Sequence, residues 1–135
     1  MAGYSGTPLW KKLGYKDGVT ALFKGAPEGY VDSLALPPDV TVNWARRATK
    51  GIGFIHLFAK QKSKLKSKLR LYRKLISPDG VIWVSWPKKS SGVETDVSED
   101  VVRDVALPTG LVDIKVCAVD ETWSALKLTI RKKLR

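Results

Sequence analysis

The sequence predicts one α/β domain, residues 1–135, with a mostly parallel sheet, helices on both faces and a C-terminal antiparallel hairpin. Strand-length apolar runs alternate with helical patterns along most of the chain. Several of these runs are nearly continuous, which is typical of strands that are buried on both faces. The last third contains two strand patterns joined by a short polar turn, which indicates a hairpin. We expect the two ends, about 1–8 and 131–135, to be less ordered than the rest.

The first third of the chain predicts a short helix, two strands and an irregular crossover between the strands. Pro8 is typical of a first helical position, and Gly14 ends this short helix. Residues 19–24 predict the first strand, and alternating side chains over 40–44 predict the second. The segment 26–39 is long enough to cross a sheet, but its glycine and prolines make a regular helix there unfavourable.

The remaining elements are predicted from periodicity and turn residues. They are a strand over 52–59, a helix over 62–76, a turn over 77–80, a strand over 81–86, a helix from Glu99 to about 107, and hairpin strands over 111–119 and 122–130. The helix over 62–76 has the clearest pattern, because its apolar residues form one stripe. Ser98 is a suitable cap for the following helix, whose first residues are acidic.

The single cysteine and the single histidine restrict the chemistry of the protein. With only Cys117 and His56 in the chain, neither an intramolecular disulfide nor a zinc or iron site is expected, and we predict no metal. His56 lies between apolar residues of a strand and is more typical of a hydrogen-bonded core residue than of a catalytic base. The first residues do not resemble a secretory signal and no apolar run reaches membrane-spanning length, so we expect a reducing cytoplasm.

Charge is strongly segregated along a chain whose formal net charge is +11. Between residues 46 and 89 there are thirteen bases and one acid, whereas residues 90–121 hold eight acids and two bases. A basic surface of this kind suits an anionic partner such as nucleic acid, an acidic protein or a membrane surface.

The helix over 62–76 carries the most concentrated positive charge. At 100° per residue, Lys62, Lys66 and Arg73 share one side with Arg70 nearby, so these four are candidate anion-binding residues. The alternative is a solvated amphipathic helix whose lysine stems cover apolar neighbours. No motif for sequence-specific nucleic-acid readout is present.

Several sequence blocks resemble known families. The blocks GYSGTPL (3–9), GAPEGY (25–30), WPKKSSGV (86–93), DVVRDVAL (100–107) and LVDIKVCAVDETWSALKL (111–128) resemble an uncharacterised bacterial family of small proteins, domain of unknown function 3052. The segments LGYKDGVTALFKGAPEG and LISPDGVIWVSWPK are similar to the skeleton of S-adenosylmethionine-dependent methyltransferases. The resemblance implies a Rossmann-like, methyltransferase-type sheet but no established activity.

The resemblance to methyltransferases raises the question whether this chain has the residues that hold S-adenosylmethionine. That superfamily has a glycine-rich turn after the first strand, and here the turn is Gly25–Gly29, in which Pro27 lacks a backbone donor. The superfamily also places an acid after the second strand to hold the ribose, whereas residues 43–46 contain no carboxylate. We therefore expect no cofactor. S-adenosylmethionine remains an alternative, which both departures weaken.

A ligand site is predicted at the carboxyl ends of the strands, where open α/β sheets bind ligands. The loops after the first and fourth strands would both lie there, and Glu28, Trp86 and Lys88 are expected to converge. The candidate ligand-binding residues are Gly25, Pro27, Glu28, Trp86, Lys88, Lys89 and Ser90.

The leading functional hypothesis from these observations is a non-catalytic protein that binds a small molecule or an anionic partner. No catalytic residue stands out, so the sequence favours a non-catalytic role and leaves open whether the protein is an enzyme. A divergent S-adenosylmethionine-dependent methyltransferase is the first alternative. A nonspecific nucleic-acid-binding protein that uses the basic helix over 60–74 is the second.

Overall fold

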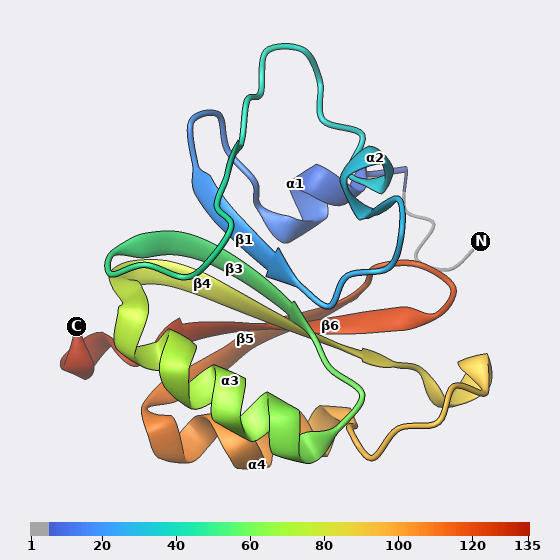
Figure 1. The fold of residues 1–135 in the computed structure, drawn as a ribbon, viewed down its shortest axis with the longest axis vertical. Coiled ribbons are helices and arrows are strands. Elements are labelled where there is room, and N and C mark those ends of the chain that lie inside the picture. Colours follow the sequence, from blue (N-terminus) through green and yellow to red (C-terminus); the bar gives the residue numbers. More distant parts are fainter. Residues whose placement is uncertain (1–5) are drawn as a thin grey trace.

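The computed structural model describes residues 6–135 and contains one six-stranded sheet in the order β2-β1-β3-β4-β6-β5 (Figure 1). The strands are β1 (Thr20–Lys24), β2 (Asn43–Trp44), β3 (Ile52–Phe58), β4 (Ile76–Pro87), β5 (Leu111–Ala118) and β6 (Trp123–Ile130). Strands β2, β1, β3 and β4 run parallel, and β6 is antiparallel to both β4 and β5. The predicted fold class, including the C-terminal hairpin, is confirmed.

Helices cover both faces of the sheet, as Figure 1 shows. They are α1 (Leu9–Leu13), α2 (Tyr30–Ser33), α3 (Lys62–Leu75) and α4 (Glu99–Ala106), with short 3-10 turns η1 (Lys89–Ser91), η2 (Leu107–Thr109) and η3 (Lys132–Leu134). One apolar core lies between the sheet and α3 and α4, and a second core lies on the opposite face under α1 and α2. The sheet is therefore apolar on both faces, which explains its near-continuous apolar strands.

Three elements differ from the prediction. The crossover contains the one-turn helix α2, which follows a left-handed Gly29 and buries Tyr30. Strand β2 has two residues rather than five, because only Asn43 and Trp44 pair with β1. Strand β4 includes the predicted turn over 77–80, because Ile76 already pairs with β3. Local turn residues were outweighed in that segment by pairing with a distant strand.

The sequence predicts that about 1–8 and 131–135 are less ordered than the rest, and the structure describes only part of the first of these segments. Residues 1–5 lie outside the described residues. At the other end η3 follows β6, and the Arg135 Nε donates a 2.7 Å hydrogen bond to the carbonyl of Ile130.

Helix α3 packs on the sheet through the predicted stripe and is capped from a distant loop. Leu65, Leu69 and Tyr72 are buried. The backbone N–H of Lys62 donates to the Asp96 Oδ1 at 2.6 Å. Because the N-terminal N–H groups of a helix lack partners within the helix, this carboxylate replaces the missing local cap. The acidic loop before α4 therefore fixes the start of the basic helix.

A chain of hydrogen bonds crosses the core under α1 and α2. The hydroxyls of Tyr15 and Tyr30 lie 2.8 Å apart, and the Tyr30 hydroxyl is 2.6 Å from the His56 Nδ1. The His56 Nε2 is 2.7 Å from the Ser85 Oγ. His56 is thus a hydrogen-bonded core residue, as predicted. Its complete burial lowers the pKa of its imidazole to about 3.

The buried imidazole predicts a loss of stability in mild acid. Unfolded His56 titrates near its ordinary pKa of 6.5, whereas the folded side chain stays neutral down to about 3. Below pH 6.5 the unfolded state therefore binds the extra proton, and stability falls as the pH falls. Linkage gives a loss of about 1.2 kcal/mol in the free energy of unfolding between pH 7 and pH 5.5, which urea titrations at the two pH values would measure.

The control for that experiment is His56→Gln, which retains hydrogen-bonding groups but does not titrate in this range. We expect it to be less stable at pH 7 and to lose much less stability between the two pH values. If the variant and the original chain lose the same amount, the acid sensitivity belongs to other groups.

The distant cap of α3 predicts a second effect on stability. Replacing Asp96 by Ala leaves the backbone N–H of Lys62 without this acceptor, at a cost of about 1 kcal/mol. Urea unfolding followed by tryptophan fluorescence would measure the change. Asp39→Ala is the matched control, since it removes the same charge from an exposed loop residue and should cost much less. Equal losses in the two variants would argue against the cap.

Candidate functional site

The sheet contains one point at which the chain reverses its direction of crossover. From β1 the chain passes to β2 on one side, then returns to β3 on the other side of β1. In open α/β sheets the crevice beyond the carboxyl ends of two such strands is the usual ligand site. Lys24 ends β1 and Phe58 ends β3, so a ligand site is expected at the residues immediately after them.

A groove of about 340 Å³ lies at this point, and we call it the crossover groove. Its lining comes from the ends of β1 and β3, the start of α3, and the hairpin. The lining residues are Lys24, Gly25, Leu57, Phe58, Ala59, Lys60, Gln61, Lys64, Lys68 and Trp123. Four of them are lysines and none is a carboxylate, so the groove favours anionic groups.

Gly25 determines how closely the two strand ends approach each other. Its φ is +74°, and a Cβ built there would lie 2.7 Å from the carbonyl oxygen of Phe58. Only glycine suits this position, because a side chain would be strained by the backbone angle and would also collide with β3. The floor of the crossover groove is therefore made by two tightly packed backbones.

Sequence reasoning identified only Gly25 among the residues of this groove. Phe58, Lys60 and Trp123 were missed, because the search for a site was limited to the loops after the first and fourth strands. The signal that could have found them is the switch in strand order, which depends on knowing that β3 rather than β4 lies beside β1.

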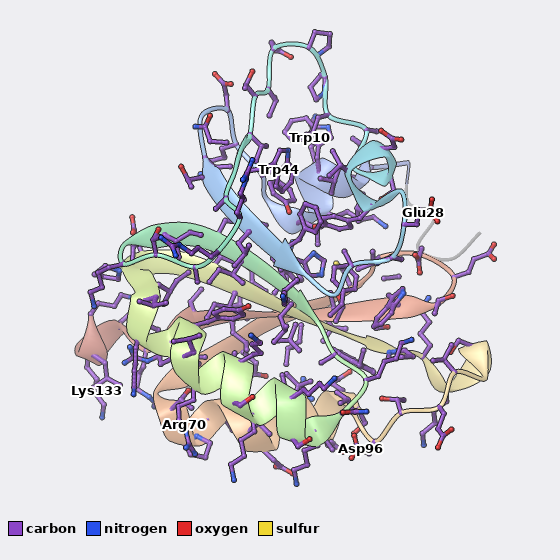
Figure 2. All side chains as sticks on the ribbon, viewed as in Figure 1. Trp10, Glu28, Trp44, Arg70, Asp96 and Lys133 are labelled. Carbon is purple, nitrogen blue, oxygen red and sulfur yellow. The ribbon has the colours of Figure 1, made fainter. Side chains whose placement is uncertain are left out.

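The other candidates after β1 lie in a separate hollow. Pro27 and Glu28 line a depression of about 350 Å³ together with Tyr30 and Asp32 of α2. Figure 2 shows Glu28 beside α2, on the side of the sheet opposite α3. The depression contains two carboxylates but no base among its lining residues.

The candidates after β4 lie in a third groove, of about 810 Å³, at the start of α4. Trp86, Lys88 and Lys89 line it, and Ser90 lies in η1. Trp86 is only 7% exposed and packs in the core under α3 and α4, so its indole mainly closes that core. The Lys88 Nζ donates a 2.8 Å hydrogen bond to the carbonyl of Asp120, which holds it against the hairpin turn.

The predicted convergence of Glu28, Trp86 and Lys88 is therefore wrong. Strand β3 lies between β1 and β4, so their loops are not adjacent. Glu28 also lines a different hollow from Trp86 and Lys88. The expectation failed because strand order cannot be read from strand positions along the chain.

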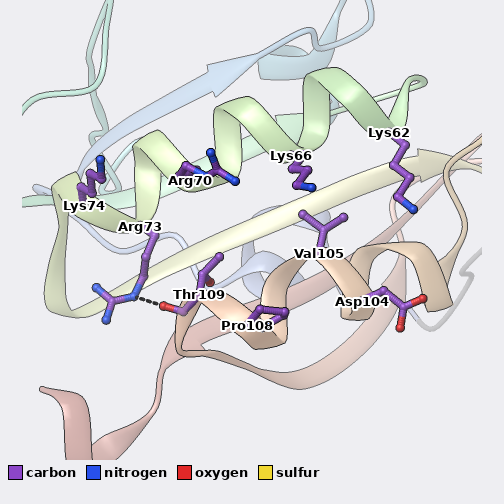
Figure 3. A pocket seen from close by; sticks show the side chains of 9 residues that line it. All are labelled: Lys62, Lys66, Arg70, Arg73, Lys74, Asp104, Val105, Pro108 and Thr109. Atoms are coloured by element: carbon purple, nitrogen blue, oxygen red, sulfur yellow. Dashed lines mark hydrogen bonds between the residues drawn. The ribbon is translucent and has the colours of Figure 1, made fainter.

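The four predicted anion-binding residues, by contrast, line one surface. Lys62, Lys66, Arg70 and Arg73 face a groove of about 680 Å³ between α3 and α4, which we call the basic groove (Figure 3). Lys74 adds a fifth base, and Asp104 is the one carboxylate in the lining. The Arg73 Nε donates to the carbonyl of Thr109 at 3.0 Å, which orients its guanidinium at one end. None of the five bases forms an ion pair with a described residue.

Residues 6–135 contain no group of three or more histidine, cysteine or carboxylate side chains that could hold a metal ion. Burial raises the pKa of the half-buried Cys117 thiol.

Among the described helices, none combines the length and the apolar character needed to cross a bilayer.

Comparison with solved structures identifies the fold class. A candidate type 11 methyltransferase from Sulfolobus solfataricus superposes with a TM-score of 0.63 at 13% identity, over 91% of this chain and 89% of that one. An S-adenosylmethionine-dependent methyltransferase from Aquifex aeolicus gives 0.60 at 16% identity, over 87% and 85% of the two chains. Fibrillarin from Aeropyrum pernix, solved with natively bound S-adenosylmethionine, gives 0.54 at 16% identity, over 85% and 68%.

No protein-family model and no curated protein matches the sequence. At these identities the structural likeness establishes a Rossmann-like, methyltransferase-type fold and leaves the activity to be proposed.

Two predictions are corrected by these neighbours. The leading hypothesis of a non-catalytic binding protein is contradicted, because proteins that share nearly the whole fold are described as methyltransferases. The findings favour its alternative, a divergent methyltransferase. The expectation of no cofactor is also unsupported, since neighbours were solved with S-adenosylmethionine. The expectation of no cofactor relied on the residues after the first and second strands, whereas the position of the crevice follows from the strand order.

The close approach at Gly25 predicts an unusual sensitivity to a single methyl group. Gly92 has the same φ of +74° but has no atom within 4 Å of a built Cβ, so it serves as a matched control. We expect Gly92→Ala to cost about 1 kcal/mol from the backbone angle alone. Gly25→Ala should cost about 1–3 kcal/mol more, because the methyl group overpacks the strand ends.

Urea unfolding of both variants would measure the difference. Equal losses would mean that β1 and β3 can separate without cost, and that the floor of the crossover groove is not rigid.

Proposed function

We propose that this chain is a divergent S-adenosylmethionine-dependent methyltransferase whose cofactor binds in the crossover groove. The observation that carries the proposal is the position of the groove, at the carboxyl ends of β1 and β3 where the strand order reverses. Its volume of about 340 Å³ lies within the range of small-molecule sites. The structural neighbours support a methyltransferase over other proteins with open α/β sheets.

The lining fits two parts of the cofactor. Lys24 ends β1, and Lys60 follows the end of the neighbouring strand β3. Both lysines suit the carboxylate of the methionine end. Phe58 and Trp123 have ring centroids 5.1 Å apart at an interplanar angle of 85°. Phe58 is 6% exposed and Trp123 is 7% exposed, so these rings would form an apolar wall of the groove against which the cofactor packs. When bound, S-adenosylmethionine supplies an electrophilic methyl group, and these residues would hold and orient it.

The ribose end has a less usual environment. The end of β2 offers Asn43 and Trp44, and neither residue supplies the carboxylate that commonly holds the ribose hydroxyls. The crossover groove has no carboxylate among its lining residues either. Binding would therefore depend on the lysines and the aromatic rings, and we expect micromolar rather than nanomolar affinity.

Calorimetric titration with S-adenosylmethionine tests this assignment. We expect one site per chain with a micromolar dissociation constant. The double variant Lys24→Glu/Lys60→Glu should weaken binding at least tenfold, since the carboxylate of the methionine end would then face two carboxylates instead of two ammonium groups.

The matched control is Lys16→Glu/Lys89→Glu, which makes the same charge change at two exposed lysines outside the crossover groove. It should bind S-adenosylmethionine as the original chain does. An absence of binding at millimolar cofactor would overturn the proposed function. Equal loss in both double variants would remove the crossover groove as the site.

We also propose that the chain belongs to the family named domain of unknown function 3052, on the basis of the blocks GYSGTPL, GAPEGY, WPKKSSGV, DVVRDVAL and LVDIKVCAVDETWSALKL. A cytoplasmic location is part of the same proposal, supported by a single cysteine that cannot form an intramolecular disulfide.

A further inference from the structure

The positive charge at the start of α3 does not serve the stability of that helix. Lys62 and Lys64 occupy its first turn, where the helix dipole disfavours positive charge, and no acid is present in that turn. Burial of the apolar stripe on the opposite side already secures the helix. Lys62 stands in an unfavourable position, and no base of the basic groove forms an ion pair with an acid among residues 6–135, which suggests that the neutralising charge comes from another molecule.

The bases lie on both flanks of α3. Lys62, Lys66 and Arg70 follow one another at four-residue intervals along the basic groove, which places successive charges about 6 Å apart. On the other flank, Lys64 and Lys68 line the crossover groove. One helix therefore joins the basic groove to the proposed cofactor site.

We propose that the basic groove binds the phosphodiester backbone of a nucleic acid, and that this nucleic acid is the methyl acceptor. The assignment of the groove rests on its own geometry, whereas the role as acceptor rests on the proposed function. A polymer bound along the basic groove runs parallel to α3 and would pass the start of that helix, where the crossover groove lies.

Several features favour nucleic acid over other anionic partners. A regular row of charges matches a polymer with a regular charge repeat better than the irregular surface of an acidic protein. Protein interfaces also depend on buried aromatic or aliphatic anchors, and the apolar lining of the groove is limited to Val105 and Pro108. A membrane-binding helix inserts an apolar face, but the outer side of α3 shows a single exposed large apolar residue, Leu71.

The lining also indicates which form of nucleic acid is bound. No aromatic side chain lines the basic groove, so stacking on unpaired bases is not available there. Contacts would be made to phosphates alone, and such contacts do not depend on sequence. We therefore expect double-stranded nucleic acid to bind at least as well as a single strand.

Fluorescence anisotropy with a labelled RNA duplex tests the groove without the cofactor. In the triple variant Lys62→Glu/Lys66→Glu/Arg70→Glu we expect at least tenfold weaker binding. The slope of log K against log salt should fall by about 0.9 for each lost phosphate contact, hence by roughly 2–3. The matched control, Lys11→Glu/Lys16→Glu/Lys115→Glu, changes the net charge equally through exposed lysines outside the basic groove and should keep the slope.

Parallel titrations with a DNA duplex, a single-stranded RNA, polyglutamate and anionic phosphatidylserine vesicles define the partner. Tighter binding to a duplex than to polyglutamate or to vesicles supports the inference. Comparison of the RNA duplex with the DNA duplex then shows which of the two nucleic acids the groove prefers. Tighter binding to polyglutamate or to vesicles overturns the inference. A groove variant that binds the duplex with unchanged affinity and slope also overturns it.

Methyl transfer separates this inference from the proposed function. With radiolabelled S-adenosylmethionine and an in vitro transcript or a DNA duplex, the triple variant should bind the cofactor normally but lose transfer to the polymer. If the chain binds a duplex but not the cofactor, the groove assignment stands and the proposed function falls. If it binds the cofactor but no duplex, the proposed function stands and this inference falls.

Discussion

The hydrogen-bonded chain of Tyr15, Tyr30, His56 and Ser85 ties four separate segments of the molecule together in the core. These residues come from the segment after α1, from α2, from β3 and from β4. A neutral imidazole has one donor and one acceptor nitrogen, so the direction of the His56 bonds constrains the direction of the Tyr30 and Tyr15 bonds. Because an unpaired buried polar group costs about 1–3 kcal/mol, the four elements are held in one arrangement.

That arrangement explains the form of the candidate site. Tyr30 is tied to β3, so the loop that leaves β1 must turn back at once toward α2. Gly25 makes this turn with a left-handed backbone against the carbonyl of Phe58. Phe58 in turn stacks on His56, with ring centroids 4.2 Å apart. The core network and the floor of the crossover groove are therefore parts of one rigid unit.

The sequence predicted the periodic elements well, because their signals are local. The stripe of Leu65 and Leu69, the Ser98 cap and the Asp120 turn depend on neighbours only a few residues away. In the structure the Ser98 Oγ accepts from Val101, and the Asp120 Oδ1 accepts from the N–H groups of Thr122 and Trp123. The anion-binding candidates were brought into one groove for the same reason, since they follow from the geometry of a single helix.

The features that the sequence did not predict depend on contacts between distant segments. The position of β3 beside β1 decides which loops meet, and no local pattern reports it. For this reason Glu28 and Trp86 were placed together although they lie in separate hollows, while Trp123 was missed although it lines the crossover groove. The Asp96 cap of α3 likewise comes from 34 residues away.

The use of the acidic residues of the sequence also depends on contacts between separate elements. The acidic segment supplies one carboxylate to the start of α3, and Arg103 of α4 engages Glu99 and Asp113 on its own side. These acids are thus committed to caps and ion pairs, and only Asp104 reaches the basic groove. A fold that uses most of its nearby acids to secure its helices leaves the bases of α3 unneutralised. The positive field over the basic groove is therefore a consequence of how the acids are used, and it extends along α3 to the crossover groove.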